Sequence, residues 1–162
     1  MSTKFRDDLR ELATDIEFRC RVARDAHFLV ARRWDSIGFG LGLSVVLVGV
    51  VGGGGGGIFT RNATVAAVFA TIAGLLGAVS SFLKTSDQVE RHKKAGDAWS
   101  VLRDSAADLY KLKIEHGNVR DDRLQKLYDD LLVSKKTVTE DSPIIPTWAY
   151  DKSFKKLKKN PM

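Results

Sequence analysis

The chain has 162 residues, a hydrophobic fraction of 44% and a formal net charge of +6 at pH 7. This length fits one ordinary domain, and the single cysteine excludes an intramolecular disulfide and a four-thiolate metal site. The average composition is that of a soluble protein, but the charges crowd residues 1–35 and 84–159, and Arg61 is the only charged residue between Asp35 and Lys84.

Residues 1–35 are predicted to form a cytoplasmic helix that leads into the membrane. Apolar side chains recur there at three- and four-residue steps from Leu9 to Ile37, which is typical of a helix packed along one side. No signal peptide is expected, because the chain begins with highly charged residues. The candidates for an interface with a second helix are Cys20, Ala23 and His27.

The first membrane-spanning helix is predicted within residues 36–60, which contain no charged residue. This run exceeds the roughly 20 residues that a helix needs to cross a bilayer. The glycines Gly52–Gly57 weaken its end, so residues 52–62 are expected to form the connecting turn. These glycines are not a phosphate-binding loop, because no Lys-Ser or Lys-Thr pair follows them. The candidate packing residues on this helix are Gly38, Gly42 and Gly49.

The second membrane-spanning helix is predicted over residues 62–83, again without a charged residue. Small or weakly polar residues recur along it at three- and four-residue steps. We name them the small-residue stripe: Thr64, Ala67, Thr71, Gly74, Ala78 and Ser81. Two interpretations stay open, because such a stripe either packs helices within one chain or faces a pore shared by several chains. The side expected to face lipid consists of Val65, Phe69, Ile72, Leu76, Val79 and Leu83.

Basic residues precede the first span and follow the second, and Arg61 alone lies between the two spans. Lys and Arg concentrate in cytoplasmic loops, so both termini are predicted in the cytoplasm and residues 52–62 outside. Trp34 is the expected interfacial anchor, and Asp35 is expected to pair with Lys84. The residues at the predicted membrane boundary are Arg32, Arg33, Trp34, Asp35 and Lys84.

A second cytoplasmic helix is predicted over residues 84–116. It leaves the membrane while the first helix enters, so the two are expected to pack as an antiparallel coiled stem. Counted outward from the membrane, His27 falls opposite His92, and Cys20 falls opposite Trp99. Two such histidines can bind a metal or sense pH, but they are more often hydrogen-bonded packing residues, and no metal site is predicted. The interface candidates on this helix are His92, Gly96 and Trp99.

Residues 120–136 are predicted to form an amphipathic helix that docks on the stem. Residues 137–162 are predicted to be a loop and a basic tail, with Pro143–Pro146 extended because residues before proline avoid helix. Two interpretations of the tail stay open, since its lysines and aromatic residues suit the anionic inner leaflet and equally a solvated, frayed end.

No residue pattern typical of catalysis is present, so neither an enzymatic activity nor a cofactor is predicted. The predicted fold class is an all-α membrane protein of one domain. A two-transmembrane helical hairpin continues into an antiparallel cytoplasmic coiled stem, followed by the amphipathic helix and the basic C-terminal segment.

Two segments of the sequence resemble a known family. These are Ala26-His-Phe-Leu-Val-Ala-Arg-Arg-Trp34 and His92-Lys-Lys-Ala-Gly-Asp-Ala-Trp99, separated by the two uncharged spans. This order is similar to that of the SLATT domains, the "SMODS and SLOG-associating two-transmembrane effector" families, from about residue 10 to Lys155. The resemblance implies a pore in the bacterial inner membrane that depolarises infected cells, and a neighbouring nucleotide-producing or nucleotide-sensing protein as partner. This chain differs from the family in its six-glycine run, and no fused sensor domain is expected in it.

Two functional hypotheses follow from these observations. The first is an oligomeric pore-forming effector of a bacterial antiviral system, opened by a nucleotide-linked or partner-protein signal. It requires a homo-oligomer, because one hairpin cannot enclose a pore. The second is a membrane anchor that tethers a partner enzyme through the coiled stem. The lipid bilayer is a partner in both hypotheses, and no nucleic-acid partner is expected.

Overall fold

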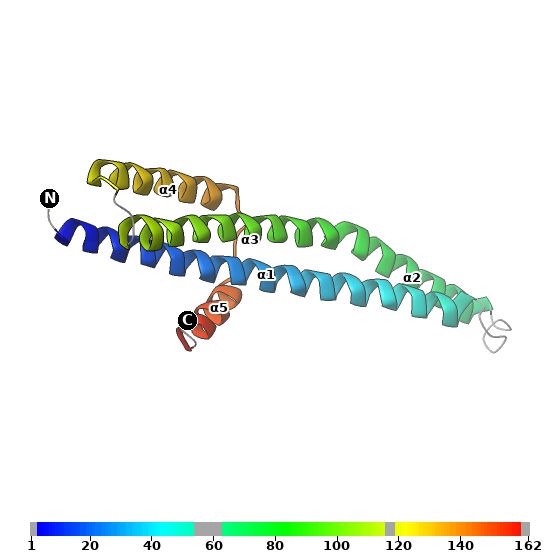
Figure 1. Cartoon of the computed structure of the whole chain (residues 1–162). Helices are drawn as coiled ribbons and strands as arrows, with labels where there is room; N and C mark the ends of the chain where they lie inside the picture. Colours follow the sequence, from blue (N-terminus) through cyan, green and yellow to red (C-terminus); the bar gives the residue numbers. More distant parts are fainter. Residues whose placement is uncertain (1–2, 54–62, 116–118, 160–162) are drawn as a thin grey trace. The chain divides into compact units, whose positions relative to one another are not determined.

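The computed structural model describes residues 3–53, 63–115 and 119–159. These residues are helical apart from short connections and include no strand, so the prediction of an all-α protein is confirmed. The helices are α1 (Thr3–Gly53), α2 (Ala63–Leu83), α3 (Thr85–Asp108), the π-helix η1 (Leu109–Glu115), α4 (Asp121–Asp141) and α5 (Thr147–Lys159) (Figure 1). Of the predicted connecting turn, Gly52 and Gly53 end α1, and residues 54–62 lie outside the described residues.

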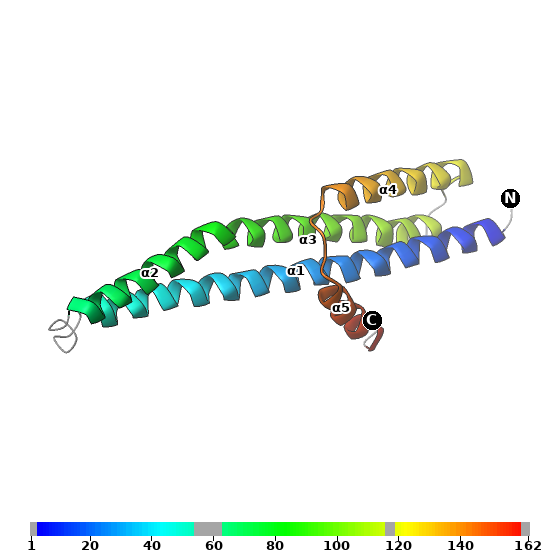
Figure 2. The ribbon, with the colours of Figure 1, turned by 180° about the vertical axis from the view of Figure 1, so that it is seen from behind.

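The helices divide into two compact units, Met1–Val30 with Arg91–Met162 and Ala31–Glu90. In the first unit, α1, α3, η1 and α4 share one apolar core. Its buried residues are Leu9, Ala13, Ile16, Cys20, Ala23, Trp99, Leu102, Ala106, Leu109, Ile114, Leu124 and Leu131. Within this unit α3 lies beside α1, and α4 lies beside α3 on the side away from α5 (Figures 1 and 2).

Helix α4 is longer than predicted, because it continues through Thr137 to Asp141. The hydroxyls of Thr137 and Thr139 donate to the carbonyl oxygens of Val133 and Lys135, four residues earlier, at 3.3 and 2.7 Å. These bonds satisfy the two hydroxyls but do not stabilise the helix, whereas Val138 packs against the core and holds this part of α4 in place. The connection to the next helix therefore shortens to Ser142–Pro146.

The C-terminal segment forms helix α5 rather than the predicted loop and tail, so the frayed-end interpretation does not hold. The carbonyl oxygen of Pro146 accepts hydrogen bonds from the amides of Ala149 and Tyr150, which begins the helix directly after the extended stretch. Ala149 and Ser153 are buried, and the ring of Phe154 packs edge-on against that of Phe18 of α1 with centroids 5.7 Å apart. These contacts attach α5 to α1 (Figure 2).

Helix α1 is continuous, but the corresponding second helix breaks at Lys84 between α2 and α3. The φ of Lys84 is 43°, in the left-handed region that interrupts a right-handed helix. The chain then restarts with a hydrogen bond from the amide of Gln88 to the carbonyl of Lys84, 3.2 Å long. We expected no break here, and the sequence Thr85-Ser86-Asp87, which is typical of helix starts, was the available signal.

The second unit contains two helices that are long and apolar enough to cross a membrane, as predicted. A core helix of a soluble protein would be mostly buried, whereas none of the most apolar 18-residue stretch of either helix is buried. The large side chains exposed here are Ile37, Phe39, Leu43, Val46, Leu47, Val50, Val51, Val68, Ile72, Leu75, Val79 and Phe82. An apolar surface of this extent is typical of contact with lipid or with other protein chains.

Candidate functional site

The histidine pair His27 and His92 is the most unusual polar feature of the first unit. Residue His27 of α1 is fully buried and His92 of α3 is 4% exposed. Their Nδ1 atoms lie 3.0 Å apart, which is hydrogen-bond distance, and the ring centroids are 5.3 Å apart. The structure therefore brings together the two histidines that the sequence placed at equal distances from the predicted membrane.

Only one of the two Nδ1 atoms can donate in this bond, so a neutral pair contains opposite tautomers. The Nε2 atom of His27 is buried without a hydrogen-bond partner. An N–H group there would lose a bond that it makes in water, which costs more than an unprotonated nitrogen does. We therefore assign the shared proton to Nδ1 of His27, with Nδ1 of His92 accepting it and the second proton of the pair on Nε2 of His92.

Burial lowers the pKa of both histidines, because a buried imidazolium loses its hydration. The pKa of His27 falls to about 4 through burial and, secondly, through the charge that His92 would bear. The pKa of His92 is also lowered by burial. Both rings are thus neutral at neutral pH, and the bond between them joins α1 to α3.

The remaining predicted interface residues surround this pair. Cys20, Ala23 and Trp99 belong to the same buried core. Burial raises the pKa of the Cys20 thiol to about 12, so the thiol is protonated and unreactive in the folded state. The indole Nε1 of Trp99 donates to Oγ of Ser142 at 3.1 Å, which ties α3 to the end of α4.

Gly96 allows α3 to approach α1 closely. A Cβ built at this position would lie 3.0–3.2 Å from three ring carbons of Phe28, closer than side chains ordinarily approach. Gly96 was a predicted interface residue, whereas Phe28, whose ring fills the space that the glycine leaves, was not. Ser142 and Phe28 are therefore interface residues that periodicity did not identify.

The small-residue stripe faces outward in the second unit, since Thr64, Ala67, Thr71, Gly74, Ala78 and Ser81 are all exposed. The half-buried residues of α2 are Val65, Ala66, Phe69, Ala73, Leu76, Gly77, Ser80 and Leu83. In both views α2 lies beside the C-terminal part of α1 (Figures 1 and 2). The side of α2 expected to face lipid is thus largely turned toward α1, and only Ile72 and Val79 of that set are exposed.

The three candidate glycines of α1 have different surroundings. A Cβ at Gly38 would lie 2.7 Å from Oγ1 of Thr85, so this glycine permits close contact with the start of α3. Nothing lies within 4 Å of a Cβ at Gly42 or Gly49, and both residues are exposed. Of the three, only Gly38 packs against another part of the described chain.

The predicted boundary residues mostly lie at the surface. Arg32, Arg33, Asp35 and Lys84 are exposed and Trp34 is half-buried. The ion pairs described in the structure do not join Asp35 to Lys84. The left-handed conformation of Lys84 is the structural feature that the boundary prediction did not include.

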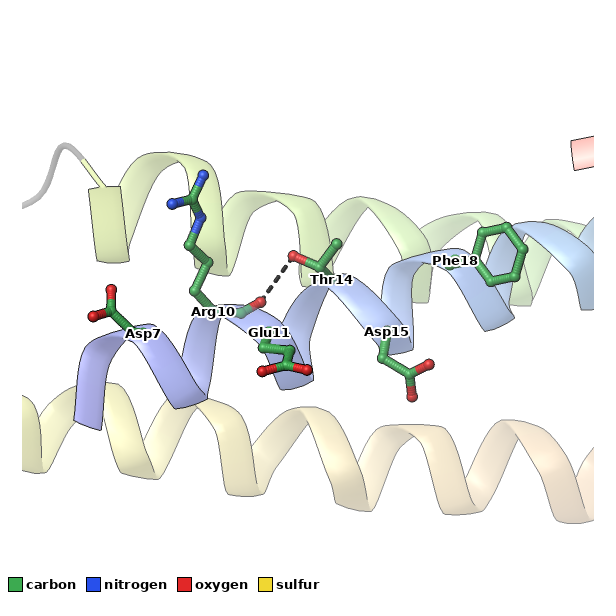
Figure 3. Close-up of a pocket in the computed structure, with 6 residues that line it drawn as sticks. All are labelled: Asp7, Arg10, Glu11, Thr14, Asp15 and Phe18. Carbon is green, nitrogen blue, oxygen red and sulfur yellow. Dashed lines mark hydrogen bonds between the residues drawn. The ribbon is translucent and has the colours of Figure 1, made fainter. Parts of the chain in front are cut away.

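An open hollow on α1 is lined by Asp7, Arg10, Glu11, Thr14, Asp15 and Phe18 and has a volume of about 660 Å³ (Figure 3). All these described residues belong to one helix, and the hydroxyl of Thr14 donates to the carbonyl of Arg10. Nothing in this arrangement converges on a ligand, so it is a solvated helix face. A second hollow of about 460 Å³ lies between α3 and the end of α4.

Comparisons with family models, with curated proteins and with solved structures found no match.

No group of three or more metal-ligating side chains occurs among the residues that the structure describes. Two neutral imidazoles fall short of the three or four protein ligands that zinc sites use. What the histidine pair can do is bind and release protons, and what the outward side of α2 can do is contact other chains.

Proposed function

We propose that residues 36–83 cross the membrane as a helical hairpin and that several copies assemble into a pore, held closed by an antiparallel stem built from α1 and α3. The supporting observation is the outward position of the small-residue stripe. In the single chain the side of α2 turned toward α1 carries both large and small residues, and none of the six stripe residues belongs to it, which leaves the stripe for contacts beyond the chain.

Small residues suit such contacts in a bilayer, because close approach of helix backbones supplies van der Waals energy that apolar surface alone cannot. Exposed Val68, Ile72, Leu75, Val79 and Phe82 form a second outward face beside the stripe, and they suit lipid. Both faces reach a suitable environment when hairpins assemble around an axis, because the stripe then contacts neighbouring helices inside and the large residues contact lipid outside. Weakly polar walls would then give a pore of low ion selectivity.

The resemblance to the SLATT families supports an antiviral role for this pore in the inner membrane, with both termini in the cytoplasm. The opening signal would come from a neighbouring nucleotide-producing or nucleotide-sensing protein, acting on the cytoplasmic helices.

A potential-sensitive dye in cells that express the chain with its neighbouring genes tests this proposal. Under the activating stimulus the wild type is expected to depolarise the membrane. Gly74→Leu and Ala78→Leu are expected to abolish the response, because both enlarge the stripe. Val79→Leu, on the outward apolar face, is the matched control and is expected to leave it intact.

Absence of depolarisation in the wild type, or full activity of both stripe variants, would contradict the pore. A stable complex with a partner enzyme in the absence of depolarisation would instead favour the membrane anchor.

A further inference from the structure

We propose that the histidine pair is a proton-binding site that controls separation of α1 from α3: the closed pair is neutral, and opening the interface takes up protons. This inference goes beyond the pore, because it concerns the interface of the first unit whether or not the chain conducts ions.

The geometry leaves room for one proton between the two rings. A separation of 3.0 Å between the Nδ1 atoms suits one N–H donor and one lone pair. If both rings were protonated, two N–H groups would face each other across this distance. A single added proton would place a net charge beside His27, which is fully buried and has an unpartnered Nε2. The closed arrangement therefore disfavours both protonated states.

No hydrogen bond or ion pair between described residues joins either imidazole to a carboxylate. On α1, Asp25 is two residues from His27, but its oxygens lie 2.6 Å from Arg24 and 3.5 Å from Lys156 of α5. On α3, the neighbours Arg91 and Lys93 are cationic and exposed, and Asp97, five residues from His92, is also exposed. Near the end of α4, Asp141 lines a hollow together with Arg91 and Lys94.

The consequence for the opening equilibrium follows from linkage. In the open state each imidazole regains water and its ordinary pKa of 6.5, whereas in the closed state the pKa of His27 is about 4 and that of His92 is also lowered. Between pH 7.5 and 5.5 protonation of His27 in the open state then favours opening about 10-fold, and protonation of His92 adds a further effect of the same sign. The direction is fixed by the sign of the shift, because acid favours the state with the higher pKa.

Cys20 provides a native probe of this opening. It is the only cysteine, it is fully buried in the same core as Trp99, and it lies seven residues, or about 10 Å, from His27 along α1. Its thiol reacts only when the interface opens, so its reaction rate reports the open population.

The experiment measures the reaction of Cys20 with dithiodipyridine, which remains reactive in acid, on the full chain in lipid nanodiscs. All chains contain His116→Gln, so that the third histidine does not titrate. Each rate is divided by that of the urea-unfolded chain at the same pH, which removes the titration of the thiol itself. The normalised rate is expected to rise by about 10-fold or more from pH 7.5 to 5.5.

The matched variant is His27→Gln with His92→Gln, whose amides can hydrogen-bond but do not titrate in this range. Its normalised rate is expected to change less than threefold over the same interval. An equal rise in the wild type and the variant, or a constant rate in the wild type, would overturn the proposal.

A second measurement covers the case in which the double variant does not fold. Nuclear magnetic resonance of the imidazole nitrogens in the His116→Gln chain reports the two remaining histidines directly. His27 is expected to stay neutral at pH 6 while Cys20 is protected, and His92 is expected to titrate below its ordinary pKa. Titration of both near pH 6.5 with Cys20 still protected would refute proton-linked opening.

Discussion

At the scale of single residues, Gly38 and Gly42 differ in their surroundings, because Gly38 is closely packed and Gly42 is exposed. They are one helical turn apart on α1, but only Gly38 approaches a neighbour, Thr85. We expect Gly38→Ala to destabilise the second unit by about 1–3 kcal/mol, because the new methyl group would overlap the Thr85 side chain. Gly42→Ala is expected to be neutral or stabilising, since it removes a helical glycine without a clash.

Thermal unfolding of helical structure in detergent, followed by circular dichroism, measures both variants. Equal unfolding midpoints for Gly38→Ala and Gly42→Ala would show that close packing of Gly38 against Thr85 does not contribute to stability.

Because the Cys20 thiol is buried, the folded chain is expected to lose stability in alkaline solution. Its pKa is raised to about 12 in the folded chain, and the ordinary value is 9.0. Above pH 9 the unfolded thiol loses its proton while the folded thiol keeps it, so stability falls as pH rises toward 12. At pH 10 this contribution is about 1.4 kcal/mol.

The check is the difference between the wild type and Cys20→Ala in the free energy of unfolding in detergent, measured at pH 8 and pH 10. Other groups that titrate in alkali affect both chains and cancel in this comparison. A constant difference between the two pH values would contradict the burial assigned to the thiol.

At the scale of helices, the break at Lys84 lowers the stability of the folded chain, because Lys84 is in the left-handed conformation. A residue with a β-carbon loses roughly 1 kcal/mol in the left-handed conformation, and glycine does not. We therefore expect Lys84→Gly to be about 1 kcal/mol more stable than Lys84→Ala, because both remove the charge and only glycine removes the strain. If alanine proves equally stable, the α2–α3 junction is a continuous helix in solution.

The sequence predicted helix type well and helix ends poorly. Long uncharged runs identified both apolar helices, and counting residues outward from the ends of these runs placed His27 opposite His92, because both signals depend on spacing along one helix. The extension of α4 to Asp141 and the packing of α5 depend on tertiary contacts, such as the one between Phe18 and Phe154. Such contacts override the weak intrinsic helix propensity of threonine, and they decide whether the short α5 segment is held against α1.

The sequence also could not predict which face of α2 contacts α1. In water an apolar stripe indicates the buried side of a helix, but lipid tails are as apolar as leucine, so Phe69 and Leu76 suit lipid and protein equally. Side-chain size alone does not decide which of the two a face contacts. The structure turns these residues toward α1 and the small-residue stripe outward.

At the scale of the whole molecule, every functional proposal except the histidine pair requires that residues 36–83 cross a bilayer. The twelve large apolar side chains exposed in the second unit are the physical reason, because they would be strongly unfavourable in water. The proposed assembly and conduction, and the expected effects of the stripe variants, all require that residues 36–83 cross the bilayer.

Site-specific labelling in spheroplasts tests the crossing most directly. In a Cys20→Ser background, one cysteine replaces Asn62, between the two spans, and another replaces the exposed Ser134 of α4. A membrane-impermeant maleimide is expected to label Asn62→Cys in intact spheroplasts and Ser134→Cys only after lysis. Equal labelling of the two cysteines before lysis, or recovery of the chain as a folded protein in the detergent-free soluble fraction, would contradict the membrane-spanning hairpin.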